Sequence, residues 1–404
     1  MLRHKSFIAL GILLLLCASA AHVTATETGE EARSGGCTAP AEAPAEQPTS
    51  VVDVPDYNAE APDPREQARE AAWNDYRRSV YDSLRRSSDP RDWALAVMTH
   101  QARFQLDDAA PDATADDTTL LERAVRAAPD DALVQWIAAR YRVGDAAPSA
   151  LAVGAAQRLL QLQPNNAALL LDDLAAAARR NDPTAVDAVL NRMSARTGFD
   201  EFQSVVLKAT LDVYRRHPLP DAYWDLVAEE EKKLPRETFA FVNAVSIAAA
   251  VAMPAYQSLV EACRVNEASG KNPQRAANCA AIGRVMVAQG GTFVDNRLGY
   301  TLLRLSRAYT DADVAAARRD DWLYSMHMQS IRLDDAQATA DSIVAYETDW
   351  METGSELEAI RRAGARAGVA TDPPADWGDD SGMFSAERLR ADAQRLADRA
   401  AAQK

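Results

Sequence analysis

Histidine, cysteine and aromatic residues are scarce in this 404-residue chain, and that scarcity argues against several kinds of site. There are five histidines and four cysteines, and aromatic residues make up 6% of the sequence. His100, His217 and His327 have no second histidine at ligand spacing, so no zinc-hydrolase motif is present. There is no Gly-x-Ser-x-Gly elbow, and Gly290-Gly291 has no Gly-Lys-Ser/Thr partner for a phosphate loop. We therefore predict no catalytic, cofactor-binding or metal-binding residues.

Two local patterns come closest to a site. Met326-His327-Met328 offers soft ligands that suit copper, but successive helix positions point about 100° apart. These side chains are better explained as part of a helix interior. Neighbouring acids such as Asp172-Asp173, Asp334-Asp335 and Glu229-Glu230-Glu231 do not face one another on a helix, so the sequence assigns them to solvated surface.

Alternation of period two is also missing, which argues against β-structure. The chain is 48% hydrophobic and dominated by Ala, Leu, Arg and Asp, which are mostly good helix formers. We predict an all-α protein. Its 59 acidic and 44 basic residues give a net charge of -15. A surface of that sign repels phosphate backbones, so we expect no nucleic-acid partner.

The first 25 residues are typical of a bacterial secretory signal. Arg3-His4-Lys5 precedes an apolar stretch from Phe7 to Leu16, and Ala18-Ser19-Ala20 forms a small-residue cleavage site. We predict cleavage after Ala20 or Ala25 and a periplasmic protein. The apolar stretch is too short to span a bilayer. Lipidation at Cys17 is the alternative, although Leu16 stands where a lipoprotein signal normally has a small residue.

Export to an oxidising compartment favours disulfide bonds over metal thiolates. We predict a Cys263–Cys279 pair, because two helical runs flank a turn-rich segment at residues 266–273. Such a bridge would join the two helices of a hairpin. The alternative is two separate buried thiols. Cys37 has no predicted partner.

Composition divides the rest of the chain. Residues 26–62 are rich in Ala, Pro and Glu and predict a disordered linker. Asp63-Pro64 is a typical helix start. We expect loops at Asp107–Thr119 and 370–382, a helix over Asp221–Lys233, and a central buried helix over Glu237–Met253. The predicted units are helical repeats over 63–216, helical hairpins over 217–369, and a loop with a terminal helix over 370–404.

The repeat prediction rests on two turns, Pro129-Asp130-Asp131 and Pro164-Asn165-Asn166, that stand 35 residues apart and are each followed by an apolar-periodic run. Counting back from Pro164, Trp136 falls at the usual aromatic position and Ala152 at the small residue of a second helix. Residues 120–200 thus resemble tetratricopeptide (TPR) repeats, although Arg140 replaces the usual glycine and Ala156 an aromatic. The resemblance implies stacked helical hairpins, a TPR-like α-solenoid whose concave face binds a protein or peptide.

From these features we predict a non-enzymatic, exported scaffold for protein binding or assembly. Arg140, Trp350 and Trp377 form the candidate partner-binding surface. The alternative is a cell-wall or carbohydrate-active enzyme with a helical cleft and dispersed carboxylates. A third interpretation is a structural domain without a ligand. A deep pocket with two facing acids would favour the enzyme, and a shallow groove lined by Arg, Tyr and Asn would favour the scaffold.

Overall fold

The computed structural model describes residues 63–106, 115–141, 148–229, 234–252, 256–269, 272–330 and 336–374, with isolated positions at 232, 254, 377, 384, 385, 389, 390 and 394. This part of the chain contains no strand, and its one bridge joins Asn166 to Gly198. The all-α prediction is confirmed for it. The predicted signal segment, the linker, Cys17, Cys37 and most of the C-terminal segment lie outside the described residues.

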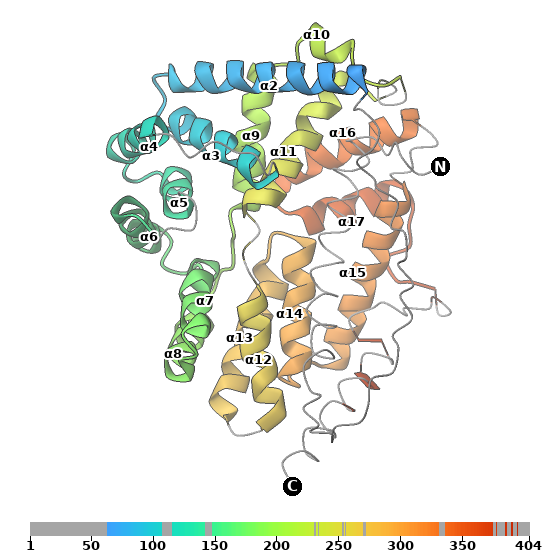
Figure 1. Ribbon diagram of the computed structural model, residues 1–404. Helices are drawn as coiled ribbons and strands as arrows, with labels where there is room; N and C mark the ends of the chain where they lie inside the picture. Colours follow the sequence, from blue (N-terminus) through green and yellow to red (C-terminus); the bar gives the residue numbers. More distant parts are fainter. Residues whose placement is uncertain are drawn as a thin grey trace, which may run out of the picture.

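Sixteen α-helices and one 3-10 turn form the described structure (Figure 1). In chain order they are α2 (Pro64–Arg85), α3 (Pro90–Leu106), α4 (Ala115–Ala127), α5 (Ala132–Arg140), α6 (Ala150–Leu162), η1 (Ala168–Leu170), α7 (Leu171–Arg179), α8 (Pro183–Ser194), α9 (Gln203–Arg216), α10 (Asp221–Trp224), α11 (Arg236–Ala252), α12 (Gln257–Ser269), α13 (Pro273–Gln289), α14 (Phe293–Leu305), α15 (Asp311–Ser330), α16 (Ala336–Thr353) and α17 (Glu356–Arg366).

Short polar side chains fix where many of these helices begin. The side chain of Asp63 accepts a hydrogen bond from the Arg65 backbone N–H at 2.9 Å, and Pro64 occupies the first turn of α2. Asp182 and Asn272 cap α8 and α13 in the same way, and each is followed by proline. Each cap satisfies backbone donors that the helix itself leaves unpaired, which explains why the start at 63–64 was predictable.

The apolar faces of the helices converge on two large cores. The first core joins α2–α6, α9, α11, α16 and α17, and its largest buried side chains include Leu84, Leu121, Phe202, Leu211 and Trp350. The second core joins α7, α8 and α12–α14 around Leu174, Leu190, Met193, Phe199 and Leu259. In Figure 1 the second core lies below the helices of the first.

The chain passes repeatedly between the two cores. Residues 76–159 belong to the first core, 167–199 to the second, 202–252 to the first, 259–305 mostly to the second, and 323–360 to the first. The predicted boundary at residue 216 therefore does not coincide with a division of the hydrophobic core.

Three local predictions were wrong in extent. The acidic segment expected to be a loop up to Thr119 becomes helical at Ala115, where Asp116 and Asp117 lie in the first turn of α4 and suit the positive end of its dipole. Within the described residues of the helix expected over Asp221–Lys233, α-helix is limited to the four-residue α10. The turn expected from residue 266 starts later, since α12 continues to Ser269.

The helix expected to be central and buried is α11. Its Phe239, Phe241 and Val245 side chains are buried, whereas Val242 and Ile247 are only partly buried.

The second core contains two tight connections. Cys263 and Cys279 form the predicted disulfide bond, which links α12 to α13. Next to it, α13 and α14 cross at two glycines. A Cβ atom on Gly283 would lie 2.8 Å from the carbonyl oxygen of Gly299, and a Cβ atom on Gly299 would lie 2.8 Å from that of Gly283. Only glycine permits this approach of the two backbones.

Within the described residues, no single helix has the length and apolar composition needed to cross a membrane. The bent pair Arg236–Ala252 and Gln257–Arg264 meets both criteria when the two segments are joined across a 49° bend.

Candidate functional site

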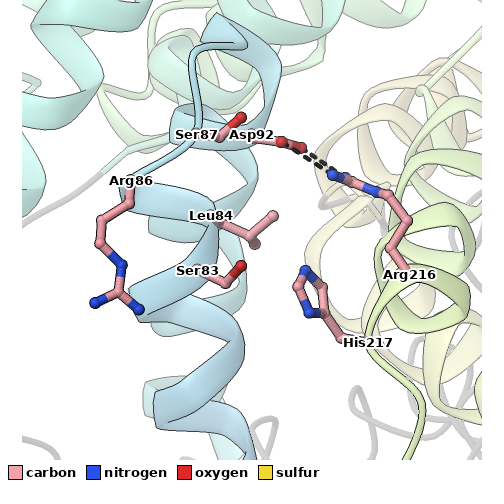
Figure 2. Close-up of a pocket in the computed structure, with 7 residues that line it drawn as sticks. All are labelled: Ser83, Leu84, Arg86, Ser87, Asp92, Arg216 and His217. Carbon is pink, nitrogen blue, oxygen red and sulfur yellow. Dashed lines mark hydrogen bonds and ion pairs between the residues drawn. The ribbon is translucent and has the colours of Figure 1, made fainter.

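An open depression lies where the end of α2 and the start of α3 meet the end of α9 (Figure 2). Its volume is about 350 Å³. The residues that line it are Ser83, Leu84, Arg86, Ser87, Asp92, Arg216 and His217. Local structure brings them together, because α2 ends at Arg85, α3 restarts at Pro90, and His217 terminates α9.

An ion pair between Asp92 and Arg216 forms one wall. The guanidinium donates to both carboxylate oxygens, at 2.6 and 3.0 Å. Burial alone would raise the pKa of Asp92, but hydrogen bonds from Arg216 and Ser87 outweigh it and hold that pKa below its usual value. Asp92 is 5% exposed, whereas the Arg216 side chain is 50% exposed. The pair fixes Arg216 at the rim with part of its guanidinium facing solvent.

Three other polar side chains remain available around the depression. Arg86 is exposed, and no hydrogen bond or ion pair occupies its guanidinium within the described structure. Figure 2 shows Ser83 and Leu84 on the α2 side facing His217 on the α9 side. Burial and the neighbouring Arg216 lower the pKa of His217, so its imidazole is neutral at pH 7. The depression thus offers guanidinium, hydroxyl and neutral imidazole groups around one aliphatic side chain.

A second polar group lies in the interior, where Glu201, Asp295, Tyr256 and Thr292 meet. Tyr256 donates to Asp295 at 2.6 Å, and the Thr292 hydroxyl donates to Asp295 at 2.9 Å. The same Thr292 hydroxyl lies 3.4 Å from a carboxyl oxygen of Glu201, so the Glu201 and Asp295 carboxyls are neighbours in the interior. Asp295 is 0% exposed and Glu201 6%. Burial raises the pKa of both, and for Glu201 the adjacent Asp295 adds to the effect.

Glu356 extends this group. Its carboxylate accepts a hydrogen bond from the Phe293 backbone N–H at 2.8 Å, and the Tyr346 hydroxyl lies 3.5 Å away. Burial is the main cause that raises the Glu356 pKa to about 7, and nearby Asp295 contributes. We call Glu201, Asp295 and Glu356 the carboxyl cluster.

Neither a family model, nor a curated protein, nor a solved structure matches the chain. The functional argument therefore depends on the chain's own residues.

The structure separates the three residues predicted to form a partner surface. The prediction that Trp350 is an exposed contact is wrong, because its side chain fills the first core and is 1% exposed. Its indole N–H donates to the Ser204 hydroxyl at 2.9 Å. Arg140, on α5, is half-buried, and its guanidinium lies 5.0 Å from the Trp136 ring centroid. Trp377 is also half-buried and packs edge-on against Trp322 of α15. The three residues do not form one surface.

The remaining candidates from the sequence that the structure describes, His327 and Asp172-Asp173, lie in the protein interior or on its surface and form no site. His327 is buried, its ring lies 4.4 Å from that of Tyr346, and burial lowers its pKa to about 4. In the described part of the chain, no group of three or more His, Cys, Asp or Glu side chains is arranged to hold a metal ion. Asp172 and Asp173 lie exposed in the first turn of α7.

Sequence reasoning found neither the depression nor the carboxyl cluster. The depression joins residues 83–92 to Arg216 and His217, and the cluster joins Glu201, Asp295 and Glu356, so no local spacing links the parts of either group. One local signal existed: Thr292-x-x-Asp295 is a helix-start pattern in which the threonine caps α14. It predicts the cap and gives no sign that Glu201 and Glu356 converge on it.

Proposed function

We propose that this protein is an exported, non-enzymatic helical scaffold of TPR-like design that binds a protein or peptide partner in the bacterial periplasm. The observation that carries the proposal is the depression between α2, α3 and α9. It is open, it is lined by Arg86, Arg216 and His217, and its single acid, Asp92, is already paired. A surface of this kind suits recognition of backbone carbonyls and carboxylates of an extended segment.

The architecture supports the same proposal. Helices α5 and α6 pack as a hairpin, as do α7 and α8, within the segment that resembles tetratricopeptide repeats. The Cys263–Cys279 bond supports an oxidising compartment, since disulfides persist there. The basic and apolar character of residues 3–16 supports export.

The rival proposal is a carbohydrate-active enzyme that uses dispersed carboxylates. One observation favours it: Glu201 and Asp295 are neighbouring acids with raised pKa values, and a glycosidase requires one such acid as its proton donor. Their geometry argues against it. Glycosidase carboxyls stand about 5 to 10 Å apart around the sugar, whereas these two are buried, and the single Thr292 hydroxyl lies within 3.4 Å of both. The scaffold is therefore the better-supported function.

Affinity capture tests the proposal. The mature wild-type chain, R86E and R126E would each be used as bait in periplasmic extract. Arg126 is a matched control, because it is an exposed arginine on α4 whose nearest acid, Glu122, is 3.6 Å away. We expect a partner that binds the purified wild type and R126E directly and binds R86E at least about tenfold more weakly, as for loss of a charge-assisted contact.

Two results would reject the scaffold. In one, R86E binds the captured partner as tightly as wild type does. In the other, the purified protein hydrolyses peptidoglycan or another glycan and E201Q abolishes that turnover, which would establish the enzyme instead.

A further inference from the structure

The carboxyl cluster lies at the boundary between the two cores. Glu201 stands between Phe199, in the second core, and Phe202, in the first. Asp295 stands between Phe293, in the first core, and Leu298, in the second. Two of the places where the chain changes core therefore meet at one pair of neighbouring carboxyls, each within 3.4 Å of the Thr292 hydroxyl.

A third crossing meets the cluster as well. Between Ala252 in the first core and Leu259 in the second lies Tyr256, whose hydroxyl donates to Asp295. Glu356 then ties the start of α17 to the start of α14, through its bond from the Phe293 N–H and through its own N–H, which donates to the Gly291 carbonyl at 2.8 Å. The polar contacts that hold the cores together at this boundary thus depend on three acids.

These acids have different interactions when neutral and when ionised. A neutral Glu201 carboxyl can donate a hydrogen bond to the neighbouring Asp295 carboxylate, whereas two neighbouring buried carboxylates repel each other and cannot form that bond. We propose that the carboxyl cluster is a proton-operated latch: protonated, it holds the two cores together, and ionised, it loosens the boundary between them without unfolding either core.

Other charged groups near the latch do not reverse this behaviour. Asp200, beside Glu201, is a further acid and adds to the repulsion. Arg140 of α5 acts electrostatically on Tyr256, and Arg297 of α14 pairs with Asp321 at 3.1 Å. From α15 and α16, Tyr324 and Tyr346 face Glu356 and stay neutral at physiological pH, since burial raises the pKa of each. His327 touches Tyr346 and is neutral above about pH 5, because its pKa is about 4.

Hydrogen exchange of the full mature chain at pH 6.0 and 8.5, corrected for intrinsic exchange rates, tests the latch. Both values lie above the titration of His327. We expect peptides covering 195–206 and 286–296 to exchange at least about tenfold faster at pH 8.5. Peptides covering α6, which lies away from the cluster, should change by less than about twofold.

Amide variants distinguish the latch from a general pH effect. Glutamine mimics a neutral carboxyl, so E201Q/E356Q should show less than about twofold change in the boundary peptides. The matched control is E347Q. Glu347 is an acid of α16 that pairs with Arg215 outside the cluster, and its side chain is 12% exposed. As in the cluster, burial raises the pKa of its carboxyl. E347Q should keep the wild-type response. Should the double variant fail to fold, E356Q alone serves, with a response smaller than that of wild type.

The proposal is overturned if the boundary peptides of wild type do not respond to pH, if all helices respond equally, or if the glutamine variants respond as wild type does. None of these results bears on partner binding at the depression, because Arg86 and the carboxyl cluster belong to separate sites.

Discussion

At the scale of single residues, the described structure places several ionisable groups where their charge matters. The clearest opposition is between Glu356 and His327, which both contact Tyr346. Burial raises the pKa of the acid and lowers that of the base. Each group therefore makes stability depend on pH, with opposite sign.

Variants should separate the two effects. Folded Glu356 holds its proton up to about pH 7, above its usual 4.5, so its contribution to stability is complete below pH 4.5 and is lost as pH rises to about 7. His327 resists protonation, so its contribution is complete above 6.5 and is lost as pH falls toward about 4. Between pH 4.5 and 6.5, we expect the slope of the free energy of unfolding against pH to be more positive for E356Q than for wild type. We expect that slope to be more negative for H327Q than for wild type. Urea titrations at four pH values measure both slopes. Equal slopes in all three proteins would contradict the assignment.

Arg216 is the charged residue of the depression whose loss should cost most stability. R216A leaves the nearly buried Asp92 carboxylate without its two charged donors. The cost should be roughly 1–3 kcal/mol at pH 7 by urea denaturation. R126A removes an exposed arginine and should change stability by less than about 0.5 kcal/mol. If R216A were as stable as wild type, solvent rather than Arg216 would supply the hydrogen bonds to Asp92.

At the scale of helices, the crossing of α13 and α14 is the most constrained contact. In G283A the new methyl group would lie 2.8 Å from the Gly299 carbonyl oxygen, so the helices must separate. We expect a loss of about 2–3 kcal/mol, in the range for overpacking. Gly154 in α6 is the control, since a Cβ there meets nothing within 4 Å. G154A should stabilise the protein by about 0.5–1 kcal/mol. Thermal melts give both values, and a destabilisation that is equal in the two variants would refute the contact.

The Cys263–Cys279 disulfide bond should stabilise the hairpin formed by α12 and α13. It closes a loop between residues 16 apart in the sequence, which corresponds to about 3 kcal/mol in the chain-entropy model. The C263S/C279S variant should lose stability of that order, and dithiothreitol should have no further effect on it. If reduction does not affect the wild-type melting temperature, the bond has no such role.

The sequence predicted the start of α2 because caps are local. Asp63-Pro64 and Asp182-Pro183 carry their own hydrogen-bond acceptors and restricted backbone, and both helices start there. Asp107–Thr119 misled because acidic residues suit a loop and a helix first turn equally well. Trp350 misled because a tryptophan near a turn looks accessible, whereas the turn lies against the first core. Glu201, Asp295 and Glu356 were beyond sequence reasoning, since only tertiary packing brings them together.

At the scale of the whole molecule, the predicted export signal has a direct test. We expect the protein recovered from the periplasm to begin at Ala21 or Thr26, because cleavage should follow Ala20 or Ala25. Intact-mass measurement and N-terminal sequencing decide between them. A lipid-modified Cys17 at the N-terminus would instead make the protein a membrane-anchored lipoprotein. An unprocessed Met1 in the cytoplasm would reject export.

The alternation of the chain between two cores also bears on how the protein folds as it is made. The first core needs Leu84 from the beginning of the described chain and Ile360 from near its end. While only the first two thirds of the polypeptide exists, side chains such as Phe241 have no α16 to cover them and stay open to mispairing. Completion of this fold must therefore await the synthesis of its last helices, and a shortened chain should aggregate rather than settle into a smaller version of the same protein.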